Sequence, residues 1–340
     1  MDNSERPFII PVFLPHLGCP HQCAFCNQTA ITSSKSRLFS SETLRLRIDK
    51  FLEYKGKRRN RIQISFYGGN FLGLKKDEIK SLLDEAARFV KAGRVDSLRF
   101  STRPDTIDVE RLDILNNYPV STIELGVQSM DDHVLKTAKR GHSALDTEKA
   151  IVLLKDRNYE IGLQMMVGLP DDDENKALDS GRKIADFAPD FVRIYPTVVL
   201  AGSPLAAWYK KGKYVPLSLE KCVTLVKKLY LLFNEKNITV IRMGLQASED
   251  LDDGSTILAG PYHPAFGHLV FSEIFLDRAT ALLKNHIPLG DTMSIRVHPR
   301  SIPKMRGLKN SNINILRKNF QLKTLNILPD AGLAEESVAI

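Results

Sequence analysis

Short apolar segments alternate along the first 200 residues with longer segments whose apolar residues recur every three or four positions. The short segments are typical of buried strands, and the longer ones are typical of helices with one buried face. We expect strands at residues 8–13, 62–67, 97–101, 122–127, 161–167 and 191–195. We expect helices at residues 44–52, 79–90, 109–117, 131–139, 145–156 and 175–187.

Six strands that each precede a helix favour parallel pairing with crossover helices. Six units are too few for a closed eight-stranded barrel, so the predicted fold is α/β, a partial (β/α)6 TIM-like barrel. In such folds the chemistry lies in the loops that follow the carboxyl ends of the strands.

The rest of the chain has a less regular pattern. We expect helices at residues 217–234 and 269–284, a strand at 238–243, a loop-like stretch at 246–267, and short strands at 294–297, 324–327 and 337–340. These elements predict two domains, a barrel core over residues 1–245 and a small α+β extension over residues 246–340. We expect the extension to contact RNA or another substrate.

Composition excludes several classes of protein. The 340 residues are 43% apolar and 26% charged, which is typical of a globular chain. No apolar stretch is long enough to cross a bilayer, and the amino terminus lacks the pattern of a signal peptide. We therefore expect a cytoplasmic protein that makes no contact with a membrane.

The net charge of +8 is concentrated in two segments, residues 55–61 and residues 296–323, and the second contains no Asp or Glu. Two interpretations remain open. The charge is either a slightly basic solvated surface or a binding surface for a polyanion, of which RNA is the obvious candidate.

Three cysteines lie together in the loop after the first strand, with the spacing C-x3-C-x2-C: Cys19, Cys23 and Cys26. Thiolates at this spacing favour an iron–sulfur cluster, since a structural zinc site usually takes four ligands in two separated pairs. His16 or His21 as a fourth zinc ligand is the alternative. The isolated Cys222 lies in a helical pattern and is expected to be buried.

The cysteine spacing and its place in the chain resemble those of the radical S-adenosylmethionine (SAM) enzymes. The resemblance implies a [4Fe-4S] cluster whose fourth iron binds SAM, and reductive cleavage of SAM to methionine and a 5′-deoxyadenosyl radical. It also implies a reductant such as flavodoxin or ferredoxin. Matching positions imply the following SAM contacts: Phe13, Phe25, Gly68, Gly69, Asn70, Ser101, Arg103, Gln128, Arg140 and Gln164.

Longer phrases, among them Thr102-Arg103-Pro104-Asp105 and Gly260-Pro261-Tyr262-His263, resemble the radical SAM half of the Elongator catalytic subunit family. That family modifies wobble uridine in tRNA with a group derived from acetyl-CoA. Because this chain ends at Ile340, we expect no acetyl-CoA domain. Tyr195 and His263 are candidates for the substrate side of the site, although His263 is equally expected to satisfy backbone groups.

Three functional hypotheses follow. The leading one is a radical SAM enzyme that modifies tRNA or another RNA. The second is a radical SAM enzyme acting on a small, porphyrin-like molecule, as in the related oxygen-independent coproporphyrinogen III oxidase. The third is a protein without radical activity that binds a cluster or RNA.

Overall fold

The computed structural model of the chain describes residues 7–28, 38–54, 61–245, 256–286 and 290–340. Its main element is a sheet of seven strands that follow one another in chain order and are all parallel. The strands are β1 (Phe8–Leu14), β2 (Ile62–Gly68), β3 (Ser97–Thr102), β4 (Val120–Gln128), β5 (Glu160–Val167), β6 (Phe191–Pro196) and β8 (Thr239–Met243).

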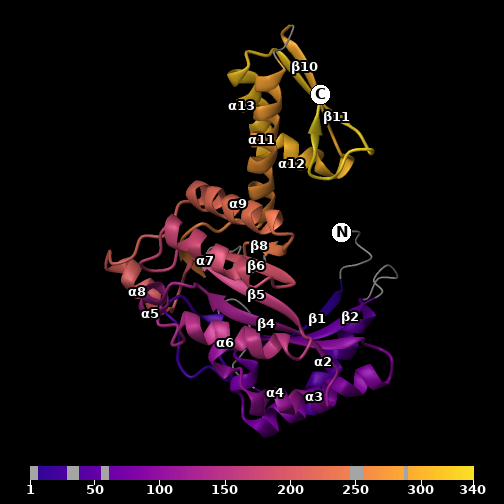
Figure 1. Cartoon of the computed structure of the whole chain (residues 1–340), viewed down its shortest axis with the longest axis vertical. Helices are drawn as coiled ribbons and strands as arrows, with labels where there is room; N and C mark the ends of the chain where they lie inside the picture. Colours follow the sequence, from indigo (N-terminus) through magenta and orange to yellow (C-terminus); the bar gives the residue numbers. More distant parts are fainter. Residues whose placement is uncertain (1–6, 29–37, 55–60, 246–255, 287–289) are drawn as a thin grey trace.

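Helices cover the outer face of this sheet (Figure 1). Serine or aspartate side chains cap the starts of several of them, as Ser143 does by accepting the N–H of Asp146. The outward strand residues, such as Val12 and Leu98, are fully buried in the main apolar core. The helices are α2 (Ser41–Glu53), α3 (Lys76–Lys91), α4 (Val109–Leu115), α5 (Asp132–Thr137), α6 (Ala144–Lys155), α7 (Glu174–Asp186) and α9 (Leu219–Glu235).

The predicted α/β partial barrel is confirmed, and all six predicted strands and their helices are present. The sheet has a seventh parallel strand, β8, which pairs with β6. The sequence pattern predicts this strand within the core range 1–245 but does not count it among the six barrel strands, because a long segment separates it from β6. That segment contains β7 (Val199–Leu200), α8 (Pro204–Lys210) and α9, and β7 pairs with β9 (Ile257–Ala259).

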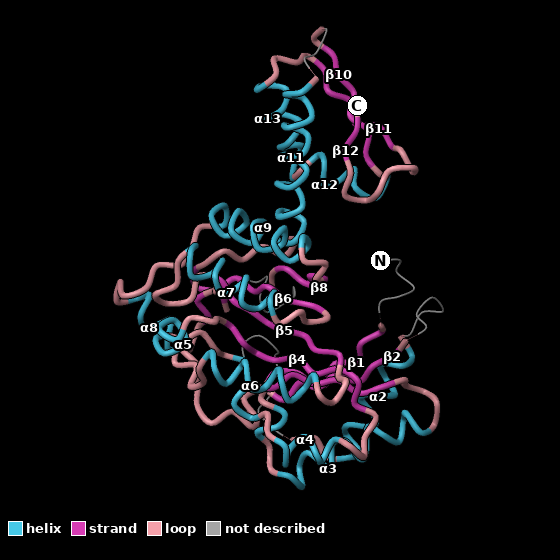
Figure 2. The backbone as a smooth tube through the Cα atoms, in the orientation of Figure 1, coloured by secondary structure: helices cyan, strands magenta, loops and turns pink. Residues whose placement is uncertain are grey.

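A second group of helices and strands lies beyond the sheet (Figure 2), and it has a small apolar core of its own. It contains a three-stranded sheet in the order β11-β10-β12, which confirms the predicted α+β extension. Its elements are β10 (Thr292–Val297), η3 (Pro299–Ser301), α12 (Ile302–Arg306), η4 (Leu308–Asn310), α13 (Ser311–Asn319), β11 (Thr324–Pro329) and β12 (Val338–Ala339).

Helix α11 (Phe266–Asn285) connects the two cores. Its first half buries Phe266, Val270 and Ile274 in the core of the sheet. Its second half buries Phe275 and Leu283 in the core of the extension. The expected domain boundary at residue 246 lies in a segment outside the described residues and stays a prediction. Nowhere in the described parts of the chain is a helix both long and apolar enough to cross a membrane.

Candidate active site

The cysteine loop, residues 15–28, follows β1 at the carboxyl end of the sheet. Cys23 is buried, whereas Cys19 and Cys26 are partly exposed. Burial raises the pKa of the Cys19 thiol. Burial, and then the charges of Cys23 and Cys19, raise the pKa of Cys26 to about 12. The three thiols are therefore close enough to affect one another's ionisation.

Arg140 points at these thiols from the segment after α5. Its Nη1 donates a hydrogen bond to Sγ of Cys23 over 3.5 Å, and its Nη2 donates to the carbonyl of Gly126 over 2.6 Å. A Cβ atom on Gly126 would lie 2.8 Å from Nη2 of Arg140, so a larger residue here would make the guanidinium move. The guanidinium is itself buried and favours a negative charge on the thiols.

Arg103 places a second buried guanidinium near the thiols. Only 2% of the residue is exposed, and its Nε and Nη2 bind Asp105 over 2.9 and 2.8 Å. None of the described residues accepts a hydrogen bond from its Nη1. Its charge, like that of Arg140, favours the thiolate form of Cys19 and acts against the effect of burial on the pKa of that thiol.

These donors fit an anionic iron–sulfur cluster. Thiolates are the usual cluster ligands, and two buried cations beside them offset the negative charge of the bound cluster. Among the described residues, no three His, Cys, Asp or Glu side chains are placed so that they could bind a single metal ion. The two histidines of the zinc alternative bind backbone groups, since Nε2 of His16 accepts from the N–H of Gln28 and Nε2 of His21 contacts the carbonyl of Arg140.

The Gly68-Gly69 turn packs against the cysteine loop. A Cβ on Gly69 would lie 2.1 Å from the carbonyl oxygen of Leu17, and one on Gly18 would lie 2.1 Å from that of Asn70. A Cβ on Gly73, in η1 (Phe71–Gly73), would lie 2.2 Å from the carbonyl oxygen of Gly18. The glycines thus allow the backbone of the cysteine loop to touch the backbone of the turn after β2. This packing requires glycine independently of the SAM contact that the resemblance implies.

Asn70 is fully buried beneath this contact. Its Nδ2 donates to the carbonyl of Gly18, and its Oδ1 accepts from Thr102, Arg103 and Thr106, over 2.7 to 3.0 Å. The side chain of Asn70 therefore joins the cysteine loop to the end of β3, and its predicted contact with SAM stays a prediction. These hydrogen bonds of Asn70 were not predicted, and no periodicity in the sequence indicates them.

A charged network lines the inner wall of the sheet. Glu124 is fully buried and lies 2.6 Å from Arg99 and 2.7 Å from Arg193. Burial opposes ionisation of Glu124, but the two guanidinium groups outweigh it and lower its pKa. Sequence reasoning missed this network. The available clue was single charged residues in otherwise apolar strands, which the structure places on β3, β4 and β6 of the same sheet.

Two predicted SAM contacts, Ser101 and Gln164, belong to this wall. Nε2 of Gln164 donates to Glu124 over 2.8 Å and to Oγ of Ser101 over 3.3 Å. Tyr195, predicted on the substrate side, lies in the same network, with its hydroxyl 3.5 Å from Nη1 of Arg193. The wall therefore joins residues from β3, β4, β5 and β6.

Phe13 and Phe25, the two aromatic residues predicted to contact SAM, lie in different environments. Phe25 packs against Val134 and Ala138 on one side and against Leu205 on the other, between α5 and α8. Phe13 faces Tyr67 of β2, with ring centroids 6.3 Å apart.

Gln128 ends β4 at a register shift, in a left-handed conformation with φ of 69°. Its Oε1 is buried and accepts no hydrogen bond from any described residue. Bulges of this kind often redirect a side chain toward a site. Gln128 therefore stays a candidate SAM contact.

His263 and Cys222 lie outside the cysteine loop and the Glu124 network. Nδ1 of His263 accepts the N–H of Ala265 at the start of α11, which matches the backbone role considered for it. Cys222 is fully buried in α9, as expected, and burial raises its pKa to about 12. Of the basic run at residues 55–61, only Arg61 lies within the described residues.

Comparison with known proteins agrees with this geometry. The radical SAM superfamily matches residues 13–183, and the Radical_SAM C-terminal domain matches residues 189–275. A tRNA uridine(34) acetyltransferase of Dehalococcoides mccartyi is 28% identical over 239 residues, which are 61% of this chain and 52% of that protein. The chain thus spans about half the length of this relative.

An uncharacterised protein of Methanocaldococcus jannaschii is 30% identical over 232 residues, 66% of this chain and 71% of that protein. Elp3 of the archaeon Methanocaldococcus infernus, solved with an N-terminal deletion, has the same fold. Its TM-score is 0.60 at 23% identity, over 78% of this chain and 62% of that chain. Because the superfamily match covers half of the sequence and includes all three clustered cysteines, the chain belongs to the radical SAM superfamily.

Proposed function

We propose that this protein is a radical SAM enzyme that cleaves SAM reductively and modifies tRNA or another RNA. The observation that carries the proposal is the set of three clustered thiols beside the buried guanidinium groups of Arg140 and Arg103. When bound, a [4Fe-4S] cluster supplies the electron that cleaves SAM to methionine and a 5′-deoxyadenosyl radical.

The chain's own residues hold and orient these groups. Cys19, Cys23 and Cys26 are the proposed cluster ligands, and each must lose its proton to bind iron. Because burial and the neighbouring thiols raise the pKa of Cys26 to about 12, we expect cluster assembly to release protons and to be favoured by higher pH. Arg140 and Arg103 then stabilise the negative charge that remains.

For SAM, we assign the backbone of the turn at Gly68, Gly69 and Asn70, with Gln128 and Phe25 beside it. Gln128 is assigned because its Oε1 is buried without a donor among the described residues. Arg103 is assigned through its buried Nη1, which has no acceptor among the described residues. Ser101 and Gln164 are assigned a positioning role, because their side chains belong to the hydrogen-bonded network of Glu124. This network fixes the side of the pocket that faces the substrate.

An RNA substrate is supported by two observations. Relatives that the chain matches are named tRNA uridine(34) acetyltransferase. Four exposed basic residues lie on the outer elements of the extension, and no acidic residue in the described ranges pairs with them. We call them the extension cluster: Arg306, Lys309, Arg317 and Lys318.

The test is anaerobic reconstitution of the purified chain with iron, sulfide and dithionite. The wild type is expected to gain a cluster absorbance and to form 5′-deoxyadenosine from SAM. The triple variant of Cys19, Cys23 and Cys26 to alanine should do neither. Cys222→Ala, which removes a buried thiol from α9, is the matched control and should retain both. Stoichiometric zinc in the wild type would refute the proposal.

The RNA substrate is tested separately by mass spectrometry of tRNA nucleosides from a strain that lacks the gene. Loss of one modified nucleoside, restored by the wild-type gene but not by the triple cysteine variant, is the expected result. An unchanged nucleoside profile, together with accumulation of a small-molecule precursor, would instead favour the porphyrin-like substrate class.

A further inference from the structure

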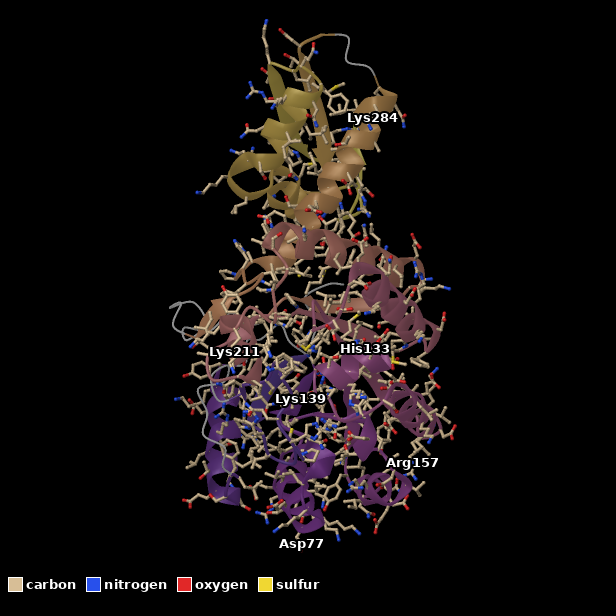
Figure 3. All side chains as sticks on the ribbon, turned by 90° about the vertical axis from the view of Figure 1, so that its left-hand side faces the viewer. Asp77, His133, Lys139, Arg157, Lys211 and Lys284 are labelled. Atoms are coloured by element: carbon tan, nitrogen blue, oxygen red, sulfur yellow. The ribbon has the colours of Figure 1, made fainter. Side chains whose placement is uncertain are left out.

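A group of exposed lysines lies beside the cysteine loop. We call it the lysine patch, and it contains residues of α5, α8 and the segments that follow them: Lys136, Lys139, Lys210, Lys211 and Lys213. Nζ of Lys139 lies 5.6 Å from the ring centroid of Trp208, which connects the end of α5 to α8. Figure 3 shows Lys139 and Lys211 on the same face of the molecule.

The lysine patch has little negative charge in its own elements, since α5 contains one acidic residue, Asp132 at its first position, and α8 contains none. Residues 133–145 and 191–219 contain no Asp or Glu, and neither do residues 6–41, which include the cysteine loop. Three carboxylates lie close to α5: Asp131 accepts the N–H of Val134, Asp132 accepts the N–H of Ala144, and Asp171 contacts His133 and Thr137. The five lysines of the patch outnumber them. An excess of charge of one sign attracts partners of the opposite charge and accelerates their association.

The elements that carry the patch also hold the cysteine loop. Ala24, between Cys23 and Cys26, donates its N–H to the carbonyl of Ala138 over 2.9 Å, and its own carbonyl accepts the N–H of Leu205 over 2.8 Å. Phe25 fills the space between the same two elements. A partner bound to the lysine patch would therefore lie directly against the backbone of the proposed cluster ligands.

We propose that the lysine patch is the docking surface for an acidic, one-electron carrier protein. This inference rests on the proposed function, which consumes one electron for each SAM cleaved. The carrier is oxidised by one electron, and that electron reduces the sulfonium of SAM as its bond from sulfur to C5′ breaks. The patch supplies the attraction that brings such a donor to the cysteine loop.

An electron carrier explains the position of the patch better than RNA does. A target base must reach the inner wall of the sheet, where Ser101 and Gln164 meet Glu124. The patch instead lies on the elements that hold the cysteine loop through Ala24. RNA is assigned to the extension cluster, on α12, η4 and α13.

The test is the affinity of the reconstituted protein for purified flavodoxin, an acidic flavin carrier, measured by calorimetry at low and moderate salt. Changing four residues of the patch to glutamate, Lys136, Lys210, Lys211 and Lys213, should weaken binding by about tenfold or more at low salt. It should also reduce the loss of affinity with added salt, because salt then screens the repulsion from the new glutamates as well as any remaining attraction.

The matched control changes the four residues of the extension cluster to glutamate and alters the net charge by the same amount. It should retain flavodoxin affinity and lose affinity for tRNA. Equal loss of flavodoxin binding in both variants, or loss of tRNA binding alone in the patch variant, would overturn the proposal. Iron content and melting temperature verify that each variant is folded. Dithionite-driven SAM cleavage by the wild type tests the proposed function independently of the carrier.

Discussion

Nδ2 of Asn70 donates a hydrogen bond to the carbonyl oxygen of Gly18, with 3.0 Å between the two atoms, and so joins the turn after β2 to the residue before Cys19. The same side chain accepts three hydrogen bonds from the end of β3 and from the η2 turn (Pro104–Thr106). The position of the cysteine loop therefore depends on a residue 52 positions away from Gly18 in the chain.

Asn70→Ala should destabilise the protein by about 2–4 kcal/mol, because it leaves several buried polar groups without partners. Asn70→Asp keeps the acceptor but places a carboxylate oxygen against the carbonyl of Gly18. We expect it to lower the iron bound per chain after reconstitution. Wild-type iron content in Asn70→Asp would show that the bond to Gly18 does not position the loop.

Gly126→Ala should have the same effect on the site as Arg140→Gln. The new methyl group would lie 2.8 Å from Nη2 of Arg140 and would displace the guanidinium from Cys23. We expect both variants to lose iron, and Gly126→Ala to lose about 1–3 kcal/mol of stability from overpacking. Gly290→Ala is the control, because no atom of the described residues lies within 4 Å of its added methyl group.

Glu124→Gln should destabilise the fold by about 3–5 kcal/mol in urea unfolding, because it leaves two buried guanidinium groups without a counter-charge. Since the folded chain lowers the pKa of Glu124, its contribution is complete above the ordinary value of 4.5 and declines as the pH falls through the folded-state value. Glu110→Gln removes an exposed ion pair with Lys76 and should change stability by less than about 1 kcal/mol.

His142 should make stability depend on pH in the mildly acidic range. Burial, and then the charges of Arg140 and Arg103, lower its pKa from 6.5 to about 3. Below pH 6.5 only the unfolded chain takes up this proton, so the free energy of unfolding should fall by about 1.4 kcal/mol for each pH unit. Urea unfolding of His142→Gln between pH 7 and pH 4 should lack this component, whereas His286→Gln, at an exposed position, should retain it.

Much of the fold could be predicted because its strands and helices follow from patterns within short segments of the sequence. Periodicity located every strand of the parallel sheet, and the spacing of Cys19, Cys23 and Cys26 indicated the loop that defines the superfamily. The pairing of β7 with β9 could not be predicted, because both strands are very short and are far apart in the sequence. Local patterns carry no information about such contacts.

The residues of the candidate site could be predicted from the sequence, but the contacts of their side chains could not. The resemblance named Asn70, Ser101 and Gln164, but it did not show that their side chains bind other protein groups. The counter-charges of Glu124 come from strands on both sides of it, so only the assembled sheet brings them together.

Helix α11 is one continuous element whose two halves are buried in different cores. A cut inside it would remove apolar contacts from both lobes at once, so the extension cannot be trimmed away without damaging the barrel. The protein should accordingly melt in a single cooperative transition, and a protease that cleaves within α11 should act only on globally unfolded molecules.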